Sequence, residues 1–203
     1  FSVNKNKNSI SDRKKPVSTK QFVIKKKFDT HQSHVLSGSI SYSYNDERRT
    51  ALALLNNILG GPSMNSRLNM EIREKRGLAY TIDSNYTPYS DSGLFTVYFG
   101  TDRKNVDQCS ALVRKEMNKF MKSKLNISQL TQAKEQLKGQ IALAEENRLN
   151  KVMNSGKSIL VLGEVYTTKE IFKRIDDVTP KLIADVANDI FPENKIYTLI
   201  FKS

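Results

Sequence analysis

The chain has 203 residues, of which 38% are hydrophobic, and this length suits one domain with a substantial core. The net charge is +12, but residues 1–27 hold nine basic residues and one acidic residue, so most of the excess belongs to an N-terminal segment rather than to a folded face that binds nucleic acid. A single cysteine, Cys109, excludes an intrachain disulfide and a cysteine-based metal site, and its apolar helical context predicts a small buried side chain. No apolar run is long enough to span a bilayer.

The N-terminal half begins with a polar segment and continues with strands and helices. Residues 1–20, rich in Asn, Lys and Ser, are predicted to form a flexible basic linker or arm, and residues 21–203 a single domain. We expect the natural chain to begin upstream of Phe1, and no targeting signal indicates a compartment. Alternating β-forming residues and helical apolar spacing then predict, in order, strands over 21–28 and 33–44 and helices over 47–59, capped by Asn45 or Asp46, and about 65–76.

The C-terminal half is mostly helical. A turn at residues 90–93 separates two predicted strands, over 79–89 and 94–100. The remaining predicted elements are helices over 105–123, from a cap at Ser128 through Ala144, over 155–162, 168–175 and 180–190 (capped by Thr179), and a last strand over 196–201. This order predicts an α+β fold, an antiparallel sheet with helices packed mainly on one face.

Several polar groups favour a structural interpretation. His31 and His34 are three residues apart at the start of a strand, which places them on opposite faces, and no third ligand accompanies them, so no metal site is predicted. The Gly60–Ser63 segment lacks the spacing of a phosphate-binding loop. Glu145 and Glu146 are adjacent on a helix and do not share a face, so a catalytic pair is not expected.

The segment from Arg73 to Tyr80 is the best candidate for chemistry. It reads as the last turn of a helix, a stop at Gly77 and the first residue of a strand. Arg73 and Tyr80 therefore flank one chain reversal. A guanidinium and a phenol are both hydrogen-bond donors, and two donors can hold a carbonyl or stabilise an oxyanion.

The residues over 54–61, 66–68 and 73–80 resemble the insulinase/pitrilysin family of zinc peptidases. The resemblance covers roughly residues 22–201 and is closest to the carboxyl-terminal, non-zinc domain of the branch that includes mitochondrial processing peptidase. In that family two similar α+β domains face each other across a chamber. The amino-terminal domain carries an inverted zinc motif, and its partner supplies an Arg and a Tyr, seven residues apart, that contact the substrate carbonyl. Arg73 and Tyr80 match this pair in type and spacing.

The resemblance implies that this chain is the substrate-binding half of a zinc-dependent metalloendopeptidase. Zn²⁺ would be bound by a different domain or subunit, because the H-x-x-E-H motif is absent here, and this chain alone is expected to be inactive. The implied partners are a zinc-bearing amino-terminal domain or homologous subunit, in a homo- or heterodimer, and a peptide substrate, with no nucleic acid and no membrane span. The alternatives are a non-catalytic structural or assembly domain of the same family and, ranked last, a module whose basic arm binds an anionic partner.

Overall fold

The computed structural model describes residue 16 and residues 21–27, 29–123 and 125–202. The predicted arm over residues 1–20 lies outside the described residues except for Pro16. Five strands form one sheet in the order β1-β5-β2-β4-β3. These strands are β1 (Val23–Lys27), β2 (Ser33–Ser41), β3 (Thr81–Pro88), β4 (Gly93–Thr101) and β5 (Tyr197–Lys202).

The sheet is mixed. β2 pairs antiparallel with both β4 and β5, and β3 pairs antiparallel with β4, whereas β1 runs parallel to β5. The α+β class predicted from the sequence is confirmed, and the parallel β1–β5 pair is a detail that the predicted antiparallel sheet did not include. Strand patterns are local, so they do not specify which distant strand becomes the partner.

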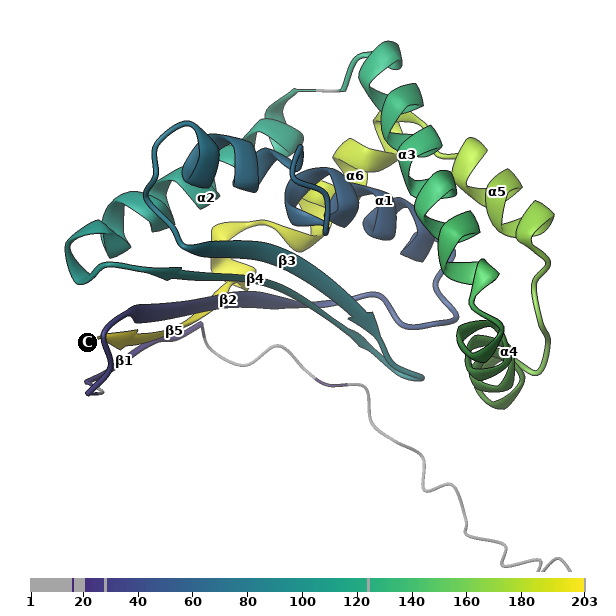
Figure 1. The fold of residues 1–203 in the computed structure, drawn as a ribbon, viewed down its shortest axis with the longest axis horizontal. Helices are drawn as coiled ribbons and strands as arrows, with labels where there is room; N and C mark the ends of the chain where they lie inside the picture. The colour runs from purple at the N-terminus through teal and green to yellow at the C-terminus, as the bar shows by residue number, and fades with distance from the viewer. Residues whose placement is uncertain (1–15, 17–20, 28, 124, 203) are drawn as a thin grey trace, which may run out of the picture.

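The helices that pack on the sheet lie on one of its faces, as the sequence predicts (Figure 1). Helices α1, α2 and α6 lie over the strands, and α3, α4 and α5 extend this layer to one side (Figure 1). Their bounds are α1 (Arg49–Gly60), α2 (Val106–Lys122), α3 (Ile127–Glu146), α4 (Arg148–Leu162), α5 (Thr168–Asp176) and α6 (Pro180–Ile190). None of the described helices is long and apolar enough to cross a membrane.

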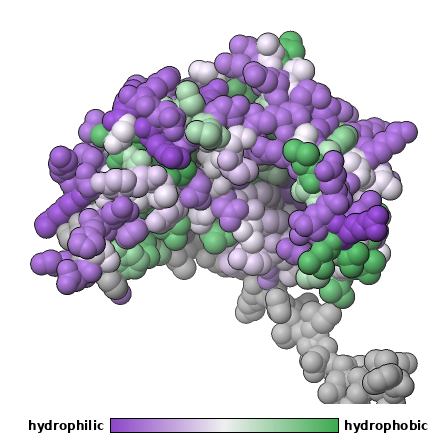
Figure 2. Space-filling model, viewed as in Figure 1, coloured by the Kyte–Doolittle hydropathy of each residue, from purple (hydrophilic) through white to green (hydrophobic). Residues whose placement is uncertain are grey.

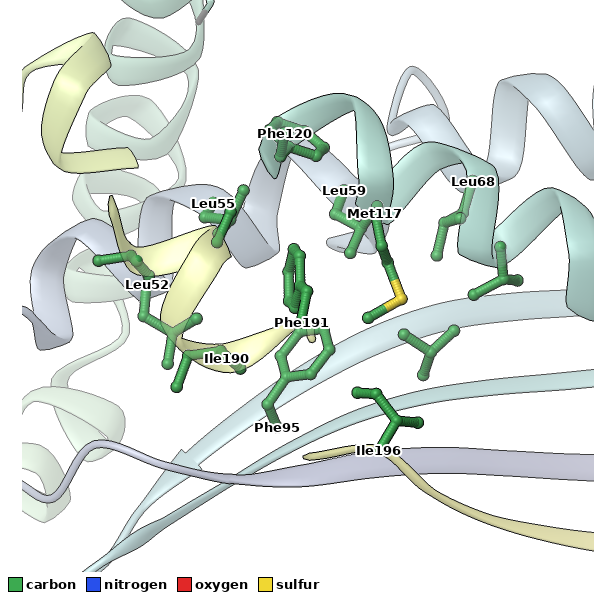
Figure 3. Close-up of a cluster of buried hydrophobic side chains, with 14 of the residues drawn as sticks. Leu52, Leu55, Leu59, Leu68, Phe95, Met117, Phe120, Ile190, Phe191 and Ile196 are labelled. Carbon is green, nitrogen blue, oxygen red and sulfur yellow. The ribbon is translucent and has the colours of Figure 1, made fainter. Parts of the chain in front are cut away.

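The core fills the space between the helices and the sheet (Figure 3). Phe95 of β4 and Phe191, just after α6, are fully buried, and their ring centroids are 5.0 Å apart at an interplanar angle of 45°. Leu52, Leu55 and Leu59 of α1 pack around them at helical spacing (Figure 3). This packing ties the N-terminal and C-terminal helices to one sheet through one core.

Three helix starts test the predicted caps. Thr179 caps α6, since its hydroxyl accepts a hydrogen bond from the Leu182 N–H at 3.1 Å, as predicted. The prediction of Ser128 as the cap of α3 is wrong, because Asn126 Oδ1 accepts from the Gln129 N–H at 2.7 Å and the helix begins at Ile127. Helix α1 begins at Arg49, two residues later than predicted, with no side-chain cap, and Asp46 instead accepts from the Arg48 N–H.

Helix α4 is longer than the sequence predicts. It begins at Arg148 rather than at residue 155, and the Asn147 side chain caps it by accepting from the Asn150 N–H at 3.2 Å. None of its residues is buried. Its first two turns were not predicted, because their apolar residues face outward and do not pack against the core.

Candidate functional site

Arg73 lies on a helical segment with unusual geometry. The chain turns into a helix at Arg67 and then widens into a π-helix, η1 (Asn69–Glu74), in which the Lys75 N–H donates to the Met70 carbonyl at 3.0 Å. Ile72 is fully buried and anchors η1 to the core, while the Arg73 side chain is 48% exposed. π-helical turns are rare and occur frequently at functional sites.

Gly77 makes the chain reversal that the sequence predicts. Its φ is +61°, in the left-handed region, and its N–H donates to the Arg73 carbonyl at 2.8 Å, which is the αL form of a helix C-cap. The Leu78 N–H then donates to the Ile72 carbonyl at 3.0 Å. The reversal therefore fixes the chain on both sides of Gly77, with Arg73 before it and Tyr80 after it.

Tyr80 is attached to the end of β4 at two points. Its backbone N–H donates to the Gly100 carbonyl at 2.9 Å, and its phenol donates to Asp102 Oδ1 at 2.9 Å. The residue is 53% exposed. The hydrogen bond to the Asp102 carboxylate, followed by the charge of that carboxylate, raises the pKa of the phenol.

The charges around Arg73 leave it the least neutralised cation of its turn. Lys75 and Arg76 both pair with Glu71, at 2.5 and 2.9 Å, and these two cations hold the pKa of that carboxyl at about 2. Arg73 has only distant partners, with its Nε 3.9 Å from Glu74 Oε1. Most of its five N–H donors are therefore available to a ligand.

Two residues that contact this pair were not predicted from the sequence. Asn69 is buried, donates from Nδ2 to the Met64 carbonyl at 2.5 Å, and so turns Oδ1 toward Arg73 Nη1, which lies 3.5 Å away. The i,i+4 spacing of Asn69 and Arg73 was a usable signal. Asp102 is 22 residues from Tyr80 in the chain, and no local pattern links them.

The other polar groups play structural roles in the described residues. His34 lies 2.8 Å from the Tyr98 hydroxyl through Nδ1 and stacks on that ring, while His31 is exposed before β2 begins. Cys109 is buried, as predicted, and its thiol donates to the Leu78 carbonyl at 3.5 Å. Burial raises the pKa of this thiol, which does not suit a nucleophile.

The loop and the glutamate pair also match the structural interpretation. Gly60–Ser63 connects two helices, and the Ser63 hydroxyl accepts from Gln136 and Gln140 of α3 at 2.7 and 2.8 Å. Glu145 accepts from the Thr168 hydroxyl at 2.5 Å, whereas Glu146 is exposed, so the two carboxylates do not act together.

The described residues contain no group of three or more His, Cys, Asp or Glu side chains that fits a metal ion. Arg73 and Tyr80 are two of the exposed side chains around the Gly77 reversal, and both carry hydrogen-bond donors that suit a peptide backbone.

Comparisons with known proteins identify the family and the fold of the chain. A family model described as peptidase M16 inactive domain matches residues 1–137. The structure of a peptidase M16 inactive domain from Pseudomonas fluorescens superimposes with a TM-score of 0.82 at 21% identity, over 93% of this chain and 45% of that chain. At that identity the superposition shows the fold alone.

Two bacterial relatives are similar in sequence. The zinc protease YmxG of Bacillus subtilis is 33% identical over 180 residues, which are 89% of this chain and 44% of that protein. The zinc protease SCO5738 of Streptomyces coelicolor is 37% identical over 161 residues, which are 79% of this chain and 35% of that protein. The chain thus spans less than half the length of these relatives.

Proposed function

Because the chain belongs to the family of peptidase M16 inactive domains, we propose that it is the substrate-binding half of a zinc-dependent metalloendopeptidase. In this proposal Arg73 and Tyr80 hold the backbone of a peptide against a zinc site that another domain or chain carries. The zinc, bound by that other domain or chain, would polarise the scissile carbonyl and activate water.

The observation that carries the proposal is that the charge of Arg73 has no close carboxylate partner among the described residues. Its neighbours Lys75 and Arg76 are neutralised by Glu71, but Arg73 projects from a π-helical turn with no carboxylate closer than 3.9 Å among the described residues. A guanidinium held this way can donate to a peptide carbonyl and support negative charge that develops on it. Removal of one such donor typically lowers kcat by about 10²–10³.

Two exposed apolar surfaces are consistent with the binding of a companion half, meaning the zinc-bearing domain or chain of the proposal. On α4, Leu149, Val152, Met153 and Leu160 are between 66% and 87% exposed and lie at helical spacing on one stripe. Figure 2 shows this apolar surface over α4. The open face of the sheet exposes Leu36, Ile40 and Leu94 by 37–42%. Contiguous apolar surfaces of this kind mark interfaces, and the relatives contain more than a second chain length of sequence to cover them.

The test uses the complete protein, with the zinc-bearing half present. Arg73→Ala should lower kcat/KM for an internally quenched peptide by about 10²-fold, while the zinc content of the protein stays the same, since the metal is bound elsewhere. Arg103→Ala removes an exposed arginine near the end of β4 and should leave turnover within about twofold.

Unchanged turnover in Arg73→Ala would contradict the assigned role. If the complete protein and its copurifying partners carry no zinc motif and cleave no peptide, the structural or assembly function holds instead. In that case both arginine variants would assemble normally, and neither would have an enzymatic phenotype.

A further inference from the structure

A cavity of about 760 Å³ lies between α4 and the neighbouring helices. Its walls come from α1, α3, α4 and α5 and from the end of β3 (Figure 1). Pockets that hold small organic ligands typically have volumes of about 300–1,000 Å³. The cavity is separate from the candidate site, because Tyr80 precedes β3, whereas Pro88 at the far end of that strand lines the cavity.

The walls of the cavity differ in polarity. Leu137 and Ile141 of α3 and Ile171 of α5 contribute an apolar wall. The α4 wall is polar over residues 151–158, where it is lined by Lys151, Asn154, Ser155, Lys157 and Ser158. Helix α4 thus turns polar side chains toward the cavity and its apolar stripe outward, which is the reverse of a helix that packs on a core. An occupant with an apolar part and a polar part matches both walls.

The charge of the cavity is positive. Four basic residues and one acidic residue line it, and none of the four forms an ion pair with a described residue. Two of them converge on Tyr166, since the guanidinium carbons of Arg174 and Arg49 lie 3.9 and 5.8 Å from the centroid of its ring. The acidic residue, Glu145, already accepts a hydrogen bond from the Thr168 hydroxyl at 2.5 Å.

We propose that this cavity binds an amphipathic anion, meaning an alkyl chain with a carboxylate or phosphate head group. The alkyl chain lies against the apolar wall of α3 and α5, where it removes apolar surface from water. The head group lies near Arg49 and Arg174, whose guanidinium groups suit the oxygens of a carboxylate or phosphate. Arg174 is exposed, so the head group keeps contact with water. This site needs neither zinc nor Arg73 and is independent of the proposed function.

The first experiment measures how binding depends on the length and charge of the ligand. The complete protein, purified free of lipid, is titrated by calorimetry with saturated carboxylates of about 8 to 14 carbons. Each added CH₂ should raise the affinity about three- to fourfold until the cavity is filled, after which the affinity should level off. The primary alcohol of the same length lacks the charge and should bind about tenfold more weakly.

The same titration with the matching alkyl phosphate and with lysophosphatidic acid distinguishes a free fatty acid from a lipid as the source. Saturable binding of any of these anions supports the site, and the tightest of them identifies the head group.

The second experiment uses two pairs of variants. Ala144 lines the cavity, so Ala144→Phe should fill part of it and weaken binding by at least about tenfold, whereas Ala142, on the same helix, is exposed outside the cavity, and Ala142→Phe should change binding less than about twofold. Arg174→Ala should weaken binding of the carboxylate about tenfold and leave that of the alcohol unchanged. Its control is Lys173→Ala, which removes an exposed cation of α5 that does not line the cavity.

Several results would overturn the inference. They are equal affinities for the carboxylate and the alcohol, equal effects of the Ala144 and Ala142 variants, and affinity that rises with chain length without levelling off, which indicates adsorption to the surface. Absence of binding by the complete protein would also overturn it, because it would mean that the companion half or a peptide occupies the cavity. None of these results affects the proposed function, which is tested by peptide turnover in Arg73→Ala, and Arg73→Ala should bind the anions normally.

Discussion

Replacing Gly77 with alanine is expected to destabilise the protein through the backbone alone. Gly77 has a φ of +61°, which an L-residue adopts at a cost of about 1–2 kcal/mol. An added Cβ would meet no atom within 4 Å, so no steric clash adds to this strain. Alanine also restricts the unfolded chain, which offsets about 0.4–1 kcal/mol, and the net loss in the free energy of unfolding is therefore about 1 kcal/mol.

Gly139 provides the matched control. It lies inside α3, and an added Cβ there also meets no atom within 4 Å, but its backbone is helical. Gly139→Ala should therefore stabilise the protein by about 0.8–1 kcal/mol. The two variants should differ by about 2 kcal/mol, which corresponds to about 4–8 °C in Tm for a domain of this size.

Thermal and urea unfolding followed by circular dichroism will measure both variants. A Gly77→Ala protein as stable as the Gly139→Ala protein would refute the reasoning, because it would mean that the left-handed turn is not required. Gly77→Asn is expected to recover part of the loss, since asparagine tolerates the left-handed region better than alanine does. A measurable change in peptide turnover in Gly77→Ala, with Arg73 and Tyr80 both intact, would tie the reversal to the site.

Two further predictions concern stability. Phe191→Ala should lower the free energy of unfolding, measured by urea titration, by about 3–5 kcal/mol, because Phe191 is fully buried against Phe95. The control is Tyr89→Ala, which should lower it much less because Tyr89 is 49% exposed. Glu71 has a folded pKa of about 2, below its ordinary 4.5, so its ion pairs stabilise the protein above about pH 4.5 and this contribution is lost as the pH falls toward 2. The difference in urea midpoint between the natural protein and Glu71→Gln should therefore shrink between about pH 6 and pH 2, and a difference independent of pH would contradict the assignment.

The sequence predicted those elements whose signals are local. The hairpin of β3 and β4, the buried face of α1 and the start of α6 at Pro180 follow from alternation, helical spacing and capping residues that sit next to one another in the chain. The reversal at Gly77 belongs to the same group, because a glycine after a helical pattern is a local signal.

The missed features depend on contacts between distant residues or on small changes of helical register. The parallel pairing of β1 with β5 joins residues that are far apart in sequence. The π-helical turn was invisible because Leu68 and Ile72 are buried at the ordinary i,i+4 spacing while the hydrogen bonds around them widen. The Tyr80–Asp102 bond was missed because it depends on how β4 ends beside β3, which only the folded chain defines.

The exposure of the candidate pair sets a condition on its activity. The Arg73 side chain is 48% exposed and Tyr80 is 53% exposed, so in this half alone water screens both of them. Hydrogen bonds from such groups gain strength when a closed site excludes water. In the proposed assembly the companion half also covers the two exposed apolar surfaces, which are the stripe of α4 and the open face of the sheet. Docking of the companion half would therefore bury apolar surface and strengthen the Arg73 interaction in one step. Replacing an exposed apolar residue of α4, such as Leu160, with a polar one should weaken the affinity between the two halves. Peptide turnover should fall with that affinity.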